Sequence, residues 1–346
     1  MIKIGVIGTG GMAAAHAKAF QAIKGVNITC CCDIFGDKAK TFSETFKIAK
    51  WYTDYRKMIA EEKLDGLSIV STDATHAEIA IAALKRRIPV LCEKPMAVTV
   101  AEAKKMLLAA KKARVVNMIN FSKRNHAGLQ AARRDILQGK IGRIMHVDAQ
   151  YLQSWLSTKH WGDWRKGSAW LWRLSTRHGS GGVMNDIGCH IYDMAGFLCG
   201  DIAEIYCELK TFPKAKGNRI GEYVLDANDS FVSTVTFKNG ALGTVHCSRW
   251  ATGHINREYL CVYGDKGAVE VDFEKGMTVY RRYDPDKDVW ETLGCKKTPS
   301  NYQRFITAIK TGKNDISDFE NGIKIQKYLE ASFKSDKIRR PVTCEF

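Results

Sequence analysis

The sequence predicts an α/β domain with a doubly wound parallel sheet, followed by an α+β domain with a large, mainly antiparallel open sheet. The chain has 346 residues, which exceeds the size at which a single hydrophobic core stops growing. Strands alternate with helices over residues 2–120, a pattern typical of parallel sheets. Beyond Arg124, alternating apolar segments are separated by turns, as in antiparallel sheets. We therefore expect two domains, residues 1–122 and residues 123–346.

Runs of apolar residues predict the strands of the first domain, and the segments between them have helical character. The expected strands are residues 2–7, 26–33, 49–52, 66–71, 89–92 and 115–120, and the expected helices are residues 14–24, 36–46, 54–62, 77–85 and 100–112. Ligands of such a sheet bind at the carboxyl ends of its strands, so the residues that follow each strand are the candidates for function.

A glycine-rich turn follows the first strand. Residues 8–13 read Gly-Thr-Gly-Gly-Met-Ala, a G-x-G-x-x-A motif between a strand and a helix. Gly8 permits the tight turn, Gly10 lets a pyrophosphate approach the backbone, and Ala13 keeps the helix close to the sheet. The second strand ends at Asp33, where a carboxylate can bind the adenosine ribose and repel a 2′-phosphate. This favours NAD, with NADP as the less favoured cofactor.

Lys94 follows the strand at residues 89–92, and Pro95 fixes the backbone beside it. A lysine at this edge could donate a hydrogen bond to a substrate oxygen near the nicotinamide, whereas an isolated loop lysine is usually a solvated residue. His76 is either a structural residue or a cofactor contact, and Asp33 has the alternative role of a helix cap. The candidate cofactor contacts of this domain are Gly8, Gly10, Gly11, Met12, Asp33, Ile34, Thr72, His76, Glu93 and Lys94.

The second domain opens with a helix and a long strand, at residues 127–138 and 143–153. Asn239-Gly240 suits a type I′ hairpin turn, and residues 264–267 form another expected turn. The other expected strands are residues 202–211, 230–238, 241–249, 257–263, 268–273 and 277–281, and two helices are expected at residues 301–312 and 317–335, packing back towards the first domain.

Residues 179–193 read Gly-Ser-Gly-Gly-Val-Met-Asn-Asp-Ile-Gly-Cys-His-Ile-Tyr-Asp. If a helix begins after Gly182, then Asp186, His190 and Asp193 share one face at i, i+4 and i+7. This face is either a reactive stripe or a buried polar network.

The segment before this stretch is rich in tryptophan, arginine and histidine. Indole rings suit the apolar faces of sugars, and arginine and histidine can bond hydroxyls; a packing arm is the alternative interpretation. The candidate substrate contacts are Arg124, Trp161, His178, Asp186 and His190.

Composition argues against several other classes. The formal net charge is +16, but the basic residues are spread along the chain without a nucleic-acid-binding motif, so no nucleic-acid partner is expected. No apolar run approaches the roughly 18 residues of a membrane span, and residues 1–6 suit a first strand better than a signal peptide. The eleven scattered cysteines form no Cys-x-x-Cys pair and indicate no disulfide framework. We expect a cytoplasmic protein without a membrane partner.

These motifs closely resemble those of the glucose-fructose oxidoreductase, inositol dehydrogenase and rhizopine-catabolism family (Gfo/Idh/MocA). The resemblance covers essentially the whole chain and rests on residues 8–13, Glu93-Lys94-Pro95, Trp172-Arg173, residues 180–190 and residues 263–268. Ser180 stands where members often have glycine. The resemblance implies an oxidoreductase of cyclic polyols or sugars, with Lys94, Asp186 and His190 as the catalytic set, Trp172 and Arg173 as further cofactor contacts, and a homodimer or homotetramer.

The implied reaction is reversible oxidation of a ring hydroxyl of a sugar, glycoside or inositol with NAD. His190 would act as general base, Lys94 would stabilise the alkoxide, and Asp186 would orient His190 or hold a neighbouring hydroxyl. One alternative is a glycoside-cleaving enzyme that oxidises its substrate transiently with bound NAD. A less favoured alternative is a non-catalytic NAD-binding sensor. A metal at Asp186, His190 and Asp193 is also disfavoured, because hydride transfer to nicotinamide needs none.

Overall fold

The computed structural model describes residues 1–345. The chain folds into two compact units: unit 1 comprises Met1–Ser122 and Pro299–Gln326, and unit 2 comprises Lys123–Thr298 and the chain from Lys327 onward. Within residues 1–345, no helix is both long enough and apolar enough to cross a lipid bilayer.

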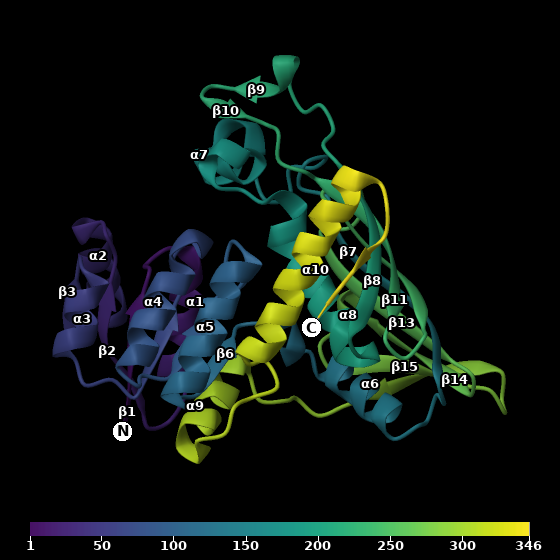
Figure 1. Ribbon diagram of the computed structural model, residues 1–346, viewed down its shortest axis with the longest axis horizontal. Coiled ribbons are helices and arrows are strands. Elements are labelled where there is room, and N and C mark those ends of the chain that lie inside the picture. Colours follow the sequence, from purple (N-terminus) through teal and green to yellow (C-terminus); the bar gives the residue numbers. More distant parts are fainter. Residues whose placement is uncertain (346) are drawn as a thin grey trace. The chain divides into compact units, whose positions relative to one another are not determined.

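Unit 1 is built on a six-stranded parallel sheet with the strand order β3-β2-β1-β4-β5-β6 (Figure 1). Its strands are β1 (Ile2–Ile7), β2 (Val26–Cys32), β3 (Lys50–Tyr52), β4 (Gly66–Ile69), β5 (Val90–Cys92) and β6 (Asn117–Ile119). Its helices are α1 (Gly11–Gln21), α2 (Gly36–Phe46), α3 (Tyr55–Glu61), α4 (Asp73–Lys85), α5 (Val100–Ala113), α9 (Asn301–Thr311) and the first part of α10 (Phe319–Ile338). This is the predicted doubly wound sheet.

The helices of unit 1 pack in two groups. Helix α1 contacts α2 and α9, whereas α4 contacts α3 and α5. Right-handed crossovers place helices before and after the reversal of strand order on opposite faces of a parallel sheet, which accounts for the two groups. Phe305, Ile306 and Ala308 of α9 join Phe20 of α1 and Ile4 of β1 in one buried cluster.

Two helices of unit 1 begin earlier than the sequence predicts. Helix α1 begins at Gly11, directly after the turn, and α4 begins at Asp73, with Thr72 as its extended N-cap residue. Asp73 in the first turn of α4 is favoured by the positive end of the helix dipole. The apolar pattern misses these first turns because their side chains are polar, small or, for Met12, exposed.

Unit 2 contains a nine-stranded sheet with the order β16-β15-β14-β13-β7-β12-β11-β8-β17. The strands are β7 (Ile144–Gln153), β8 (Ile202–Lys210), β11 (Ser230–Phe237), β12 (Leu242–Ser248), β13 (Asn256–Gly264), β14 (Gly267–Asp272), β15 (Val279–Asp284), β16 (Val289–Gly294) and β17 (Val342–Thr343). All neighbouring strands are antiparallel except β7 and β12, which confirms the mainly antiparallel sheet. The sequence did not predict β16 and β17.

Smaller elements complete unit 2. They are α6 (Ala127–Leu137), α7 (Ser168–Leu171), α8 (Cys189–Cys199), the strand pair β9 (Arg219–Ile220) and β10 (Tyr223–Val224), the π-helical turn Met184–Gly188, and the short helical turns Ser122–Asn125, Trp164–Lys166, Trp172–Leu174, Thr176–His178, Lys216–Asn218 and Phe273–Lys275.

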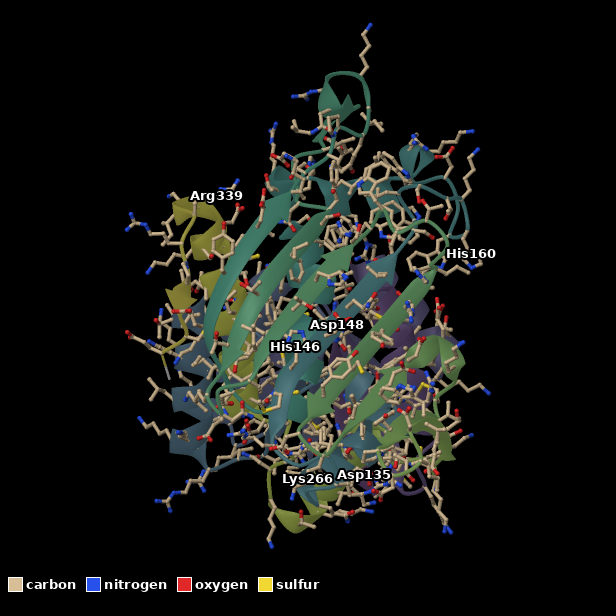
Figure 2. All side chains as sticks on the ribbon, turned by 90° about the vertical axis from the view of Figure 1, so that its right-hand side faces the viewer. Asp135, His146, Asp148, His160, Lys266 and Arg339 are labelled. Carbon is tan, nitrogen blue, oxygen red and sulfur yellow. The ribbon has the colours of Figure 1, made fainter. Side chains whose placement is uncertain are left out.

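One face of the unit 2 sheet is covered and the other is open. The side chains of Val147, Ala149 and Tyr151 on β7 are buried, on the side where α8 packs. His146 and Asp148 alternate with them and lie on the open face, which looks toward the viewer in Figure 2. This alternation is the two-residue period of a sheet with one buried face.

Candidate active site

The glycine turn of unit 1 has the shape that a pyrophosphate requires. Gly8 has a φ of +89°, and a Cβ there would lie 2.6 Å from the backbone of Val70 and Ser71. Around Gly10 and Gly11, by contrast, a Cβ would meet no atom within 4 Å. Helix α1 begins at Gly11 with no side-chain cap, so its first N–H groups can bind an anion. Met12 is half exposed beside them.

Asp33 is bound to the same turn. Its Oδ2 accepts hydrogen bonds from the N–H of Thr9 (2.9 Å) and from Thr9 Oγ1 (2.8 Å), and its Oδ1 accepts from the N–H of Phe35 (3.0 Å). The carboxylate is therefore held beside the glycine turn, where it can also accept from ribose hydroxyls. Ile34 is 80% exposed and offers an apolar surface next to it.

Thr72 and His76 lie at the start of α4. The His76 ring is buried, with Nδ1 2.9 Å from the carbonyl oxygen of Pro95 and Nε2 3.2 Å from that of Ser71. These contacts join the end of β4 to the loop after β5, so they are structural. A cofactor contact by His76 stays a prediction.

Glu93 is buried at the end of β5 in a polar network that the sequence did not predict. Its Oε1 lies 2.8 Å from His16 Nε2 and accepts from Asn120 Nδ2 (2.5 Å), and its Oε2 accepts from the N–H of Lys94 (3.2 Å). His16 Nδ1 lies 2.8 Å from Ser68 Oγ. Burial raises the pKa of Glu93, but the hydrogen bond and charge of His16 and the charge of Lys94 outweigh it, so the pKa is lowered. The carboxylate thus stays ionised and fixes the backbone of Lys94.

Lys94 itself is partly exposed, and the Lys94–Pro95 peptide bond is cis. It follows β5 as Gly8 follows β1 and Asp33 follows β2. All three therefore lie at the carboxyl edge of the unit 1 sheet, where ligands of doubly wound sheets bind.

In unit 2, the predicted helix after Gly182 is interrupted by a π-helical turn. This turn spans Met184–Gly188, and the N–H of Cys189 bonds to the carbonyl oxygen of Met184, five residues earlier. The expectation of one regular α-helical face through Asp186, His190 and Asp193 was therefore wrong in its geometry, because the wider turn rotates Asp186 relative to α8. Such turns are frequent at functional sites.

Two arginines hold the carboxylate of Asp186. Arg249 Nη2 donates to Asp186 Oδ2 at 2.9 Å, and Arg173 Nη1 donates to the same oxygen at 3.4 Å. Arg249 is fully buried, whereas the Arg173 side chain is 35% exposed. Arg173 was predicted to bind the cofactor, and the hydrogen bond described for its guanidinium is with Asp186.

His190 lies on α8 and is buried near Tyr151, with 6.3 Å between the ring centroids. The Tyr151 hydroxyl donates to Asn256 Oδ1 (3.1 Å), and Lys123 lies over the Tyr151 ring and forms an ion pair with the buried Glu258. Burial raises the pKa of Tyr151, and the charge of Glu258 adds to the effect. Tyr151 is therefore a neutral hydroxyl beside the imidazole at ordinary pH.

Comparison with known proteins identifies the family. A model described as oxidoreductase family, NAD-binding Rossmann fold, matches residues 2–121, and a model of the GFO/IDH/MocA C-terminal domain matches residues 129–270. The chain belongs to the GFO/IDH/MocA family. The predictions of a Rossmann fold, an oxidoreductase and an NAD cofactor are thereby confirmed.

Relatives of this family member include two dehydrogenases. Levoglucosan dehydrogenase of Pseudarthrobacter phenanthrenivorans is 28% identical, over 79% of this chain and 74% of the relative. Myo-inositol 2-dehydrogenase of Thermotoga maritima is 26% identical, over 80% of this chain and 77% of the relative. An oxidoreductase domain protein from Kribbella flavida has the same fold, with a TM-score of 0.88 and 29% identity over 100% of this chain and 99% of that structure.

The tryptophan-rich arm of this GFO/IDH/MocA member, residues 154–178, has its own small core. Trp155 and Trp164 are buried with Leu171 and Leu225, so these two indoles serve packing. Trp161 is partly buried and stacks on Trp170, at 6.2 Å between ring centroids. Trp172 is 40% exposed, with the Arg173 guanidinium 4.9 Å from its ring centroid. His178 packs against Tyr223 at 4.3 Å, and its Nδ1 lies 3.0 Å from Ser175 Oγ.

Arg124 was predicted to contact substrate, but its described contacts are structural. Its guanidinium is 2% exposed and forms a two-pronged ion pair with Asp193, with Nε to Oδ2 at 2.8 Å and Nη2 to Oδ1 at 2.7 Å. It also packs over the Phe197 ring. Asp193 therefore supports α8. Across residues 1–345, no cluster of three histidine, cysteine, aspartate or glutamate side chains could hold a metal ion.

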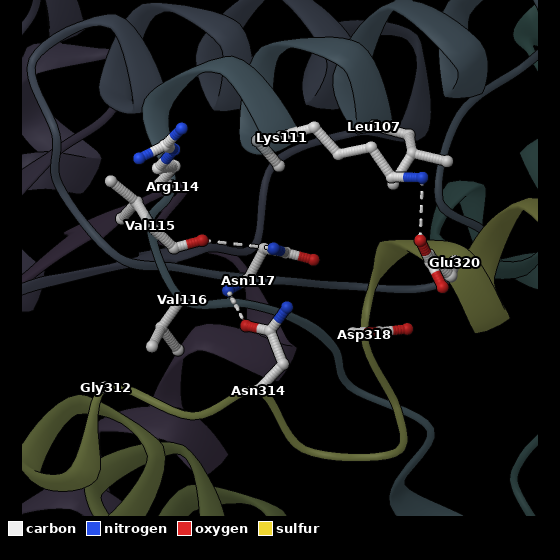
Figure 3. Close-up of a pocket in the computed structure, with 11 residues that line it drawn as sticks. Leu107, Lys111, Arg114, Val115, Val116, Asn117, Gly312, Asn314, Asp318 and Glu320 are labelled. Atoms are coloured by element: carbon white, nitrogen blue, oxygen red, sulfur yellow. Dashed lines mark hydrogen bonds and ion pairs between the residues drawn. The ribbon is translucent and has the colours of Figure 1, made fainter.

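A hollow of about 280 Å³ lies in unit 1 (Figure 3). It is lined by the end of α5, the start of β6 and the segment after α9, and Lys111 pairs there with Glu320 at 2.8 Å. Asn117 is the first residue of β6, so the hollow lies at the amino end of that strand, opposite the cofactor edge.

Sequence reasoning missed Arg249, Tyr151, Glu258 and Lys123. Tyr151 and Glu258 are paired across β7 and β13 and both lie on the buried face. The alternating pattern of β13 places Glu258 at an inward-facing position, so the sequence alone could have marked this glutamate as a functional candidate. Its partner Lys123, 135 residues away, was not predictable from local pattern.

Proposed function

We propose that this protein is an NAD-dependent dehydrogenase that oxidises a ring carbinol of a sugar, glycoside or inositol. The observation that carries the proposal is the position of Lys94 at the carboxyl edge of the unit 1 sheet, the edge that also holds Gly8 and Asp33. The two dehydrogenases named above, for levoglucosan and for inositol, support this class of substrate.

The proposed roles follow from the chemistry of each side chain. His190 takes the proton of the substrate hydroxyl on an imidazole nitrogen. Lys94 donates a hydrogen bond to the same oxygen and stabilises the developing alkoxide. Asp186 accepts from His190 or from a neighbouring hydroxyl. NAD, when bound, accepts the hydride of the carbinol carbon.

The cofactor would be held by Gly8, Gly10, Gly11, Met12, Asp33, Ile34, Thr72 and Glu93. The open space at Gly10 and Gly11 and the uncapped start of α1 fit a pyrophosphate, and the Asp33 carboxylate fits an unphosphorylated ribose. Trp172, Arg173, Trp161 and His178 remain candidate contacts of cofactor or substrate. We assign cofactor binding to residues 1–122, and substrate binding and subunit contacts to residues 123–346.

The test is a turnover assay of the purified protein with NAD against a panel of sugars, glycosides and inositols, read by NADH absorbance. We expect at least one substrate, and we expect Lys94→Ala to lower kcat by about 10² or more while NAD binds normally. Lys104→Ala, on the exposed face of α5, is the matched control and should retain full activity. The absence of turnover with every compound, in protein that binds NAD, would contradict the proposal.

The same assay separates the alternatives. Release of an aglycone without net NADH would indicate a glycoside-cleaving enzyme that oxidises its substrate transiently. NAD binding without any turnover would indicate a sensor.

We further propose a cytoplasmic homodimer or homotetramer that associates through the open face of the unit 2 sheet. Tyr206, Val232 and Leu242 are 37%, 59% and 53% exposed on β8, β11 and β12, which is unusual apolar exposure for a solvated sheet. All eleven cysteines are free, as expected in a reducing compartment. Light scattering would measure the mass, and a monomer would contradict the assembly.

A further inference from the structure

Arg249 is buried at a junction of three segments of unit 2. It follows β12, its N–H bonds to the carbonyl oxygen of Asp229 (2.9 Å), and its own carbonyl accepts from Leu156 (3.3 Å). The residue is 0% exposed, and its guanidinium lies 5.1 Å from the centroid of the Trp155 ring. The backbone and the indole therefore fix the position of this charge.

One described carboxylate, that of Asp186, is in direct contact with the buried guanidinium. Nη2 bonds to Asp186 Oδ2 (2.9 Å), Nη1 bonds to the carbonyl oxygen of Arg173 (3.2 Å), and Nε has no hydrogen-bond partner among residues 1–345. A buried guanidinium is strongly destabilising once its carboxylate partner is lost. Asp186 must therefore remain ionised to balance Arg249.

We propose that Arg249 is a positioning residue that keeps Asp186 ionised and sets the orientation of its carboxylate for the reaction. This inference rests on the proposed function, in which Asp186 accepts a hydrogen bond and His190 takes the proton. The Arg249 contact is shorter than that of Arg173 and is shielded from water, so Arg249 is the main support and Arg173 the weaker one.

The groups around Asp186 are consistent with this assignment. Arg173 and Arg249 favour its charged form, and His190 follows one turn later in the chain. Tyr151 is the neutral hydroxyl whose pKa the charge of Asp186 helps to raise. Asp229, whose charge also acts on Arg249, is already paired with Lys214 at 2.7 Å.

The first test needs no substrate. Asp186→Asn, Arg249→Met and the double variant are unfolded in urea. If Arg249 depends on Asp186, adding Arg249→Met to Asp186→Asn raises the urea midpoint, because it removes the uncompensated charge. A double variant that unfolds at a lower midpoint than Asp186→Asn would overturn the pairing, even if the enzyme assay had found no substrate.

The second test measures kcat/KM against pH. Without the cation, a carboxylate is protonated more easily, so the acid limb of Arg249→Met should move up by about one pH unit or more. Arg249→Lys retains the charge and should restore the limb at least in part.

Arg257→Met is the matched control, because it removes an arginine paired with Asp272 at 2.9 Å in the same sheet. Arg257→Met should leave the acid limb of the kcat/KM profile unchanged. If Arg249→Met also leaves it unmoved and lowers the rate equally at every pH, Arg249 is merely structural and the proposal fails. Should Arg249→Met not fold, Arg249→Gln, which also removes the charge, takes its place against Arg173→Met. The larger pH shift is expected for Arg249→Gln, and a larger shift for Arg173→Met would overturn the proposal.

Discussion

Glu93 in unit 1 and Asp186 in unit 2 are two carboxylates beside proposed catalytic groups, and they are held in different ways. Glu93 lies among His16, Asn120 and the N–H of Lys94 at a buried strand end. Asp186 is 25% exposed on its side chain and is held by two guanidinium groups. A buried network of hydrogen bonds fixes Glu93 as part of the framework, whereas an ion pair fixes Asp186 and leaves it partly accessible. The difference indicates which carboxylate can contact substrate.

The largest effect is expected for Asp186→Asn, which should break the ion pair. We expect kcat to fall by about 10² or more, and the free energy of unfolding to fall by about 3 kcal/mol because Arg249 loses its balancing charge. Urea denaturation and the turnover assay measure the two effects. Unchanged stability would contradict the role of Asp186 in balancing Arg249.

The stability of the two units should respond to acid in different pH ranges. Burial lowers the pKa of His126, the N-cap of α6, from 6.5 to about 4, and the charge of Lys123 contributes. The folded protein favours the neutral imidazole of His126. Its contribution to the free energy of unfolding is complete above pH 6.5 and is lost as the pH falls towards 4, a total loss of about 3 kcal/mol.

Glu93 loses its contribution in the same direction, but at lower pH. Its pKa is lowered from 4.5, so its contribution persists above 4.5 and is lost only as the pH falls through the lower folded value. Between pH 6.5 and 4.5 the urea midpoint should therefore fall because of His126 in unit 2, and Glu93 in unit 1 should not contribute to that fall. His126→Asn, which retains a capping oxygen, should abolish most of that fall. An equal fall in the variant would assign it to other groups.

Glu93→Gln should have a smaller effect on stability, of about 2 kcal/mol. The amide oxygen can still accept from His16 and Asn120, but the amide nitrogen would then face the N–H of Lys94, a donor against a donor. Because Lys94 is displaced, kcat should fall more than NAD affinity. Glu78→Gln, an exposed change on α4, is the control, and equal effects of both variants would contradict a framework role.

Gly10→Ala should have the smallest effect on the fold. A Cβ at Gly10 meets no protein atom within 4 Å, so the urea midpoint should hardly change, while NAD affinity should fall about tenfold because the methyl group occupies the phosphate space. Calorimetric titration with NAD measures this effect. Normal NAD binding would place the pyrophosphate elsewhere.

The sequence by itself determined the fold class, the glycine turn, Asp33 at the end of β2 and the family. Each of these depends on local periodicity or on motifs a few residues long, and local physics is enough to read them. The roles of Lys94, Asp186 and His190 and the domain boundary at residue 122 were also read from the sequence, and they stay predictions.

Tertiary structure alone decided which groups hold these residues. Arg249 reaches Asp186 across 63 residues, Arg124 reaches Asp193 across 69, and Glu93 meets His16 across 77. The π-helical turn before α8 likewise follows from packing, since neither propensity nor spacing marks the extra residue. The arrangement of strands and helices determines which residues pair with a buried charge, because it brings distant segments together. No local pattern in the chain specifies these pairs.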